Sequence, residues 1–175
     1  MSALFLVGPR GAGKSSVGAR AAAVLGVTFI DSDGCVEERS GLSVAEIFAR
    51  SGEPAFRALE RGVLLELLEA DPPAVVATGG GCVLDADVRA RLAEHPGVLW
   101  LTAPLAELRR RVRLAPRPSL TGTDPADELG PIVRAREPLY RACAGGSDGL
   151  DTGALTLDQA AAEVARRFRD LRGGG

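Results

Sequence analysis

The chain has 175 residues, of which 46% are hydrophobic and 25% charged, and its formal net charge is −2. This length and apolar content suit one folded domain over residues 1–175, and the near-neutral charge argues against partners such as nucleic acid or an anionic membrane surface. Three widely spaced cysteines, a single histidine and the lack of a long apolar run argue against a disulfide framework, a histidine-ligated metal site and a membrane span. We therefore expect a cytoplasmic protein, and we expect it to be a monomer.

A phosphate-binding loop is predicted at residues 8–15. The apolar run at 3–7 indicates a buried strand, and Gly-Pro-Arg-Gly-Ala-Gly-Lys-Ser then leads into an alanine-rich helix. Glycines let the backbone N–H groups surround phosphate oxygens, and the helix N-terminus adds partial positive charge. Lys14, the only lysine, is predicted to reach the β- and γ-phosphates, and the Ser15 hydroxyl suits Mg²⁺. The predicted nucleotide-binding residues here are Gly11, Ala12, Gly13, Lys14, Ser15 and Ser16.

Two carboxylates follow the second predicted strand, at residues 27–30. Ligands of open parallel sheets collect at the carboxyl ends of strands, so Asp31 and Asp33 should face the phosphate loop. An ordinary helix N-cap is the alternative, but two carboxylates around Ser32 exceed what a cap requires, and we favour a functional role. Because the chain contains no asparagine, the Asn-Lys-x-Asp guanine-recognition motif is absent, and ATP is the expected nucleotide.

Residues 34–50 show two short helical patterns that break at 41–43, where Ser43 and Glu46 form a capping box. A longer helix opens at 51–60 and continues through Leu68. Within it, Arg57 and Glu60 lie one helical turn apart. Taken alone, this spacing favours an ion pair on a solvated helix face.

A third buried strand is predicted at 74–77, and it runs into Thr78 and the glycines 79–81. Three consecutive glycines expose backbone N–H groups and admit the close approach of a ligand. Helical patterns at 85–94 and 104–113 enclose a fourth strand at 98–101.

The stretch at 115–125 is rich in Pro, Gly, Ser and Thr, and a loop of this length in a compact domain is typically a lid or a binding loop. Arg117 lies between two prolines and is a candidate mobile cation. A helix at 126–144 follows, which Pro131 and Pro138 should break or kink. A short strand at 149–152 and a helix at 155–171 complete the chain. The alternation predicts an α/β fold with three layers, in which a parallel five-stranded sheet lies between helices.

In combination, these motifs resemble the shikimate kinases, which are small P-loop kinases related to nucleoside monophosphate kinases. The resemblance implies a mobile lid at about 113–125 and a substrate-binding region at about 33–61. Ser119 departs from the Arg-Pro-Leu-Leu pattern of the family's lid. The matching motifs are Asp31-Ser32-Asp33, Gly52-Glu53-x-x-Phe56-Arg57-x-x-Glu60, Thr78-Gly79-Gly80-Gly81, Arg117-Pro118-x-Leu120 and Arg136-x-Pro138-Leu139-Tyr140.

The resemblance implies transfer of the γ-phosphate of ATP to the 3-hydroxyl of shikimate, with Mg²⁺ as cofactor and catalysis by Lys14, Asp33 and Arg117. On the acceptor side, the resemblance implies that Arg57 and Arg136 clamp the carboxylate, that Asp33 binds the ring hydroxyls and accepts the proton, and that Gly79, Gly80 and Gly81 supply backbone donors. On the nucleotide side, it implies that Asp31 contacts Mg²⁺ through water beside Ser15 and that Arg117 closes over the phosphates. Adenine packing is assigned to Arg110, with Arg109 and Arg111 as alternatives. Another kinase of a polyhydroxylated acid such as gluconate, or a nucleotide-binding relative without catalysis, remains the alternative.

Overall fold

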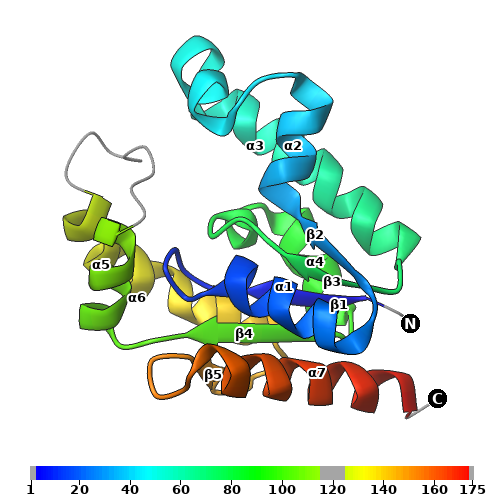
Figure 1. The fold of residues 1–175 in the computed structure, drawn as a ribbon. Coiled ribbons are helices and arrows are strands. Elements are labelled where there is room, and N and C mark those ends of the chain that lie inside the picture. The colour runs from blue at the N-terminus through cyan, green and yellow to red at the C-terminus, as the bar shows by residue number, and fades with distance from the viewer. Residues whose placement is uncertain (1–2, 115–124, 174–175) are drawn as a thin grey trace.

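The structure is a computed structural model, and it describes residues 3–114 and 125–173. Its centre is a sheet of five strands in the order β2-β3-β1-β4-β5, with every pair parallel (Figure 1). The predicted α/β fold with a parallel five-stranded sheet is thereby confirmed. The strands are β1 (Leu4–Val7), β2 (Thr28–Asp31), β3 (Ala74–Ala77), β4 (Val98–Thr102) and β5 (Leu150–Asp151).

Helices alternate with the strands, as the sequence predicts. The helix α3 contains a break at Gly52, whose φ of 78° and ψ of 174° are not helical. It therefore consists of two segments, which meet where the longer helix at 51–60 was expected to open. Ser43 and Glu46 form the expected capping box at its start. The helices are α1 (Lys14–Leu25), α2 (Ser32–Ser40), α3 (Val44–Ala70), α4 (Ala86–Glu94), α5 (Leu105–Leu114), α6 (Pro125–Cys143) and α7 (Leu157–Gly173), with a 3₁₀ turn, η1, at Cys82–Leu84.

The expected helix at 126–144 is present as α6 and continues through Pro131 and Pro138, so a break at these prolines is wrong and a kink stays a prediction. Each proline removes the donor for the carbonyl four residues earlier, which belongs to Asp127 and Arg134 respectively. All four residues are exposed, so water can hydrate the two carbonyls. The cost of a proline inside a helix falls when the freed carbonyl faces solvent.

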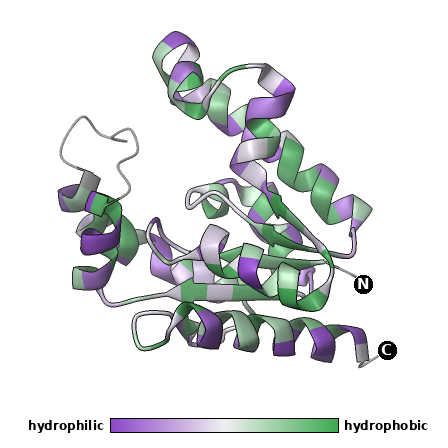
Figure 2. Ribbon diagram, in the orientation of Figure 1, coloured by the Kyte–Doolittle hydropathy of each residue, from purple (hydrophilic) through white to green (hydrophobic). Residues whose placement is uncertain are grey.

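The sheet is covered on both faces. Leu4 and Leu6 of β1 pack with α1, α5 and α7, whereas Phe5 and Val7 pack with α3, α4 and α6. Burial on both faces explains why the central strands are continuous apolar runs rather than alternating ones. In Figure 2 the strands are coloured as hydrophobic, while the surrounding helices alternate between hydrophobic and hydrophilic residues. The predicted three-layer arrangement is confirmed.

A smaller cluster lies away from the sheet, where α2 and α3 extend beyond the carboxyl ends of the strands (Figure 1). Its buried members are Val36, Ile47, Phe56 and Val63. This cluster holds together the region at 33–61 that the sequence associates with the substrate. Of the helices in the described ranges, none has the length and apolar character that a membrane span requires.

Candidate active site

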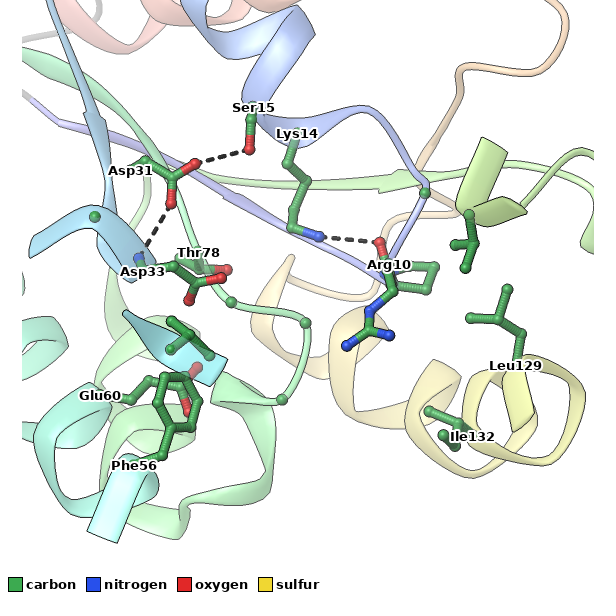
Figure 3. A pocket seen from close by; sticks show the side chains of 18 of the residues that line it. Arg10, Lys14, Ser15, Asp31, Asp33, Phe56, Glu60, Thr78, Leu129 and Ile132 are labelled. Atoms are coloured by element: carbon green, nitrogen blue, oxygen red, sulfur yellow. Dashed lines mark hydrogen bonds between the residues drawn. The ribbon is translucent and has the colours of Figure 1, made fainter. Parts of the chain in front are cut away.

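A cavity of about 740 Å³ lies at the carboxyl ends of the central strands, between the α2–α3 region and helices α5 and α6 (Figure 3). Its size is in the range typical of small-molecule sites. Two predicted site residues, Ala12 and Arg110, are not among the described residues that line it. Those that do line it are Gly11, Gly13, Lys14, Ser15, Ser16, Asp31, Asp33, Arg57, Gly79, Gly80, Gly81 and Arg136.

The loop after β1 has the backbone of a phosphate-binding loop. Gly13 takes a left-handed conformation with φ of 88° and stands at the N-cap of α1, and within the described chain no side chain caps that end of the helix. The N–H groups of the first turn of α1 can therefore donate to an anion, and the residues at this helix end line the cavity. The ammonium of Lys14 donates to the carbonyls of Gly8, at 2.7 Å, and of Pro9, at 2.9 Å. Lys14 is only 9% exposed, so its charge lies within its own loop.

Ser15 and Asp31 meet at the edge of this loop. The Ser15 hydroxyl donates to Oδ2 of Asp31 at 2.8 Å, while Oδ1 of Asp31 accepts from the backbone N–H of Asp33 at 3.1 Å (Figure 3). Asp31 is thus the N-cap of α2 and also lines the cavity, so the cap is confirmed and the functional role of Asp31 stays a prediction.

The oxygen atoms of Ser15 and Asp31 are the hard ligands that Mg²⁺ prefers. No group of three or more His, Cys, Asp and Glu side chains in the described chain could enclose a metal ion. Mg²⁺ in nucleotide sites normally takes few protein ligands and completes its shell with phosphate and water. The residues present therefore fit this ion, provided that a nucleotide supplies the remaining oxygens.

Arg57 is held by two carboxylates. Its Nη1 donates to Oε2 of Glu60 at 2.7 Å, and its Nε and Nη2 donate to Oε1 of Glu53 at 3.1 and 3.0 Å. The expected ion pair is therefore confirmed, but its expected position on a solvated face is wrong, because Glu60 is only 3% exposed. Burial raises the pKa of the Glu60 carboxyl, and Arg57 partly opposes that rise.

Two of the three glycines after β3 make room for charged side chains of the protein itself. A Cβ at Gly79 would overlap Oε1 of Glu60, and a Cβ at Gly81 would overlap the guanidinium of Arg57. The N–H of Gly79 donates to the buried Ser32 hydroxyl at 3.1 Å. The sequence predicted these glycines as sites of close approach for a ligand. It did not predict that Glu60 and Arg57 occupy that space.

Arg136 reaches the same glycine loop from α6. Its Nη1 donates to the carbonyl of Gly80 at 3.2 Å, and the buried Tyr140 hydroxyl donates to the same carbonyl. Arg57 lies against Gly81, so the two arginines predicted as a clamp reach one short loop from different helices. Sequence reasoning assigned no role to Tyr140, because its bond depends on how α6 packs against that loop.

The arginines of α5 differ in their positions. Arg110 is 61% exposed and pairs with Glu107. Arg111 lines the cavity and donates to the carbonyl of Gly11, at 3.1 Å, and to Oγ1 of Thr152, at 2.9 Å. Hydrogen bonds from Arg110 and Arg111 lower the pKa of Glu107 to about 2. Arg109 donates from Nε to the carbonyl of Ala126. Arg111 therefore contacts the phosphate loop, and adenine packing by Arg110 stays a prediction.

The predicted lid falls mostly outside the described residues. Of the range 113–125, only residues 113 and 114, at the end of α5, and 125, at the start of α6, lie within them. Arg117 lies outside the described residues.

The fold and the site together define a class of protein. A glycine-rich phosphate loop after β1, a carboxylate and a hydroxyl suited to Mg²⁺, and two arginines around a cavity of substrate size are the features of a P-loop kinase of small molecules. Among solved structures, a shikimate kinase from Acinetobacter baumannii in complex with shikimate superposes with a TM-score of 0.82, over 99% of this chain and 94% of that one, at 34% identity.

Sequence comparison defines the family. A family profile described as "Shikimate kinase" matches residues 10–168. A shikimate kinase of Caulobacter vibrioides is 49% identical over 138 residues, which are 78% of this chain and 68% of that protein. One of Nitrosococcus oceani is 38% identical over 172 residues, which are 98% of this chain and 89% of that protein. The chain belongs to the shikimate kinase family of ATP-dependent phosphotransferases.

Proposed function

We propose that this chain transfers the γ-phosphate of ATP to the 3-hydroxyl of shikimate, as a monomer in the cytoplasm. One observation carries the proposal: a phosphate loop and two arginines suited to a carboxylate line the same cavity. A nucleotide on the loop and a carboxylic acid between the arginines would lie side by side. Shikimate is the acceptor because the family is that of shikimate kinases, and the region at 33–61 would bind it.

The two arginines orient the acceptor. Arg57 and Arg136 bind the substrate carboxylate with their planar guanidinium groups, and the glycine loop contributes backbone contacts. Asp33, which lines the cavity next to Gly79, binds the ring hydroxyls and accepts the proton of the attacking one. A carboxylate of ordinary basicity suffices, because phosphoryl transfer depends mainly on positioning and charge stabilisation.

The transfer itself exchanges one phosphorus–oxygen bond for another. The hydroxyl oxygen of the acceptor bonds to the γ-phosphorus, and the bond from that phosphorus to the β–γ bridging oxygen breaks. The electron pair of the broken bond leaves with ADP, and the hydroxyl proton passes through Asp33 to solvent. Lys14 moves from the carbonyls of Gly8 and Pro9 onto the β- and γ-phosphates, where its charge stabilises the transition state.

Ser15 and Asp31 would hold Mg²⁺, Ser15 with its hydroxyl and Asp31 through water. When bound, the ion would neutralise part of the phosphate charge. The hydrogen bond between the two side chains keeps both oxygens directed at one position beside the loop.

Arg117 completes the set of catalytic residues through the family resemblance alone, because it lies outside the described residues. We propose that it contacts the phosphates mainly in the transition state. Its replacement by alanine should therefore lower kcat by orders of magnitude and leave ATP affinity nearly unchanged.

A coupled assay of ADP release tests the function. ATP and Mg²⁺ are supplied with shikimate, with gluconate, or without an acceptor. We expect turnover with shikimate and only background release in the other two reactions. Faster release with gluconate would identify a kinase of another polyhydroxylated acid, and ATP binding without turnover would identify a non-catalytic relative.

A further inference from the structure

The phosphate loop carries a second cation, Arg10, which the assignments above leave without a role. It directly follows Pro9, whose carbonyl accepts from the ammonium of Lys14 at 2.9 Å. Arg10 is half-buried and lines the cavity. In Figure 3 its guanidinium extends from the loop into the cavity, on the side of α6 that carries Leu129 and Ile132.

The backbone places Arg10 where the two halves of the cavity meet. A Cβ added at Gly80 would lie 3.4 Å from the backbone nitrogen of Arg10 and 3.5 Å from the carbonyl oxygen of Gly8. The phosphate loop and the glycine loop therefore lie close together at this point, with room for about one methyl group between them. The Gly80 carbonyl also accepts from Arg136, so Arg10 stands between the nucleotide side and the arginine pair on the acceptor side.

The cations of the cavity lie in different regions of it, so they would contact different parts of the substrates. Lys14 lies inside the loop, towards the N-terminus of α1, where nucleotide phosphates are expected. Arg57 lies at Gly81 on the far side, against Glu60. During transfer the phosphoryl group lies between the two regions, next to the junction that Arg10 occupies, and it carries a charge of about −2 once it is attached to the acceptor.

We propose that Arg10 binds the transferred phosphoryl group, in the transition state and in the product, so that it is a catalytic and product-binding residue. The inference rests on the proposed function. A guanidinium suits this task because its planar fork can contact two phosphate oxygens at once. The contact strengthens as the phosphoryl group reaches the acceptor, whereas the acceptor's carboxylate remains with Arg57 and Arg136.

The test compares Arg10→Met, which removes the charge and keeps most of the length, with Arg10→Lys, which keeps the charge without the fork. The matched control is Arg134→Met, which removes an exposed arginine of α6 that does not belong to the described lining of the cavity. Titration calorimetry of the full-length proteins gives the Kd of shikimate and of shikimate 3-phosphate, and the coupled assay gives kcat. Thermal unfolding verifies that each variant is folded.

We expect Arg10→Met to raise the Kd of shikimate 3-phosphate and to lower kcat, each by at least about tenfold, with the Kd of shikimate changed less than about twofold. Arg10→Lys should lose part of the preference for shikimate 3-phosphate over shikimate. If Arg10→Met does not fold, the Kd values and kcat of Arg10→Lys test the inference instead. Arg134→Met should match the unmodified protein in all three quantities.

An unchanged Kd for shikimate 3-phosphate in Arg10→Met overturns the inference. An equal loss for shikimate and its phosphate also overturns it, because Arg10 would then contact the carboxylate or shape the site. Both results are distinct from failure of the proposed function, in which the unmodified protein itself would bind neither compound.

Discussion

Nη1 of Arg57 donates to Oε2 of Glu60 at 2.7 Å, and the carboxylate that accepts it is almost completely buried. The other oxygen of Glu60, Oε1, has no hydrogen-bond partner in the described part of the chain. An exposed pair at this spacing would contribute only ~0.3–0.5 kcal/mol to stability. A buried one holds the guanidinium in one orientation, with the glycine loop packed against it.

Arg57→Lys should raise the KM for shikimate by at least about tenfold and leave the KM for ATP unchanged, because an ammonium cannot contact a carboxylate in the bidentate manner of a guanidinium. The control is Arg50→Lys in the same helix, since Arg50 is 63% exposed and pairs with Glu46. Steady-state kinetics of both variants give the KM values for shikimate and for ATP. Equal KM values for shikimate in Arg57→Lys and the unmodified protein would remove Arg57 from the substrate site.

Lys14→Ala should reduce kcat by more than about tenfold, or more than ~1.4 kcal/mol of transition-state stabilisation, because no other side chain of the loop can take its position at the phosphates. The variant should fold but unfold at a lower temperature, since the carbonyls of Gly8 and Pro9 lose their donor, at a cost of the order of 1 kcal/mol each. In this respect Lys14 differs from a surface lysine, whose loss would leave the unfolding temperature unchanged.

The control for Lys14 is Arg20→Ala, which removes an exposed cation of α1 that pairs with Asp158. It should retain both activity and unfolding temperature. Retention of more than about a tenth of kcat by Lys14→Ala would contradict the phosphate-loop assignment.

Gly81→Ala should weaken shikimate binding, because its Cβ would overlap the guanidinium of Arg57 and displace it. Gly80→Ala is the matched control: its nearest contact would be 3.4 Å, an ordinary van der Waals distance, and the backbone N–H is retained. Calorimetric titration with shikimate should show a loss for the first variant and little change for the second. If both variants bind alike, the glycine loop does not position Arg57.

The three cysteines should differ in reactivity. Burial raises the pKa of Cys82 to about 12 and that of Cys143 to about 11, whereas Cys35 is only half-buried. Because the thiolate is the reactive form, iodoacetamide at pH 8 should modify Cys35 first. Mass spectrometry of partly labelled protein gives the order in which the three cysteines are modified. Modification of Cys82 as fast as that of Cys35 would show that the packing around η1 is looser than described.

Much of the fold was predictable from local sequence. The strands at 3–7, 27–30, 74–77 and 98–101 were expected within two residues of their observed ends, because buried parallel strands are continuous apolar runs. The order of strands in the sheet was not predicted, since it depends on how distant segments pack. The helix α6 was expected, but its continuity through two prolines was not, because the cost of a proline depends on which side of the helix faces solvent.

The residues of the candidate site also differ in how far local sequence could predict them. Lys14, Ser15 and Asp31 were found from motifs whose spacing is set by one loop and one strand end. Glu60 was misjudged, because its burial comes from the approach of Gly79, nineteen positions away in the chain. The role of Gly81 in making room for Arg57 has the same origin, since neither segment shows it alone.

Phosphorus NMR of the reaction of ATP, Mg²⁺ and shikimate tests the central claim most directly. We predict one new phosphomonoester signal, coupled to the ring proton at C3 and formed in equal amount to ADP, with no excess of inorganic phosphate. An ester at another hydroxyl, or release of inorganic phosphate without any ester, would contradict the proposal that this chain phosphorylates the 3-hydroxyl of shikimate.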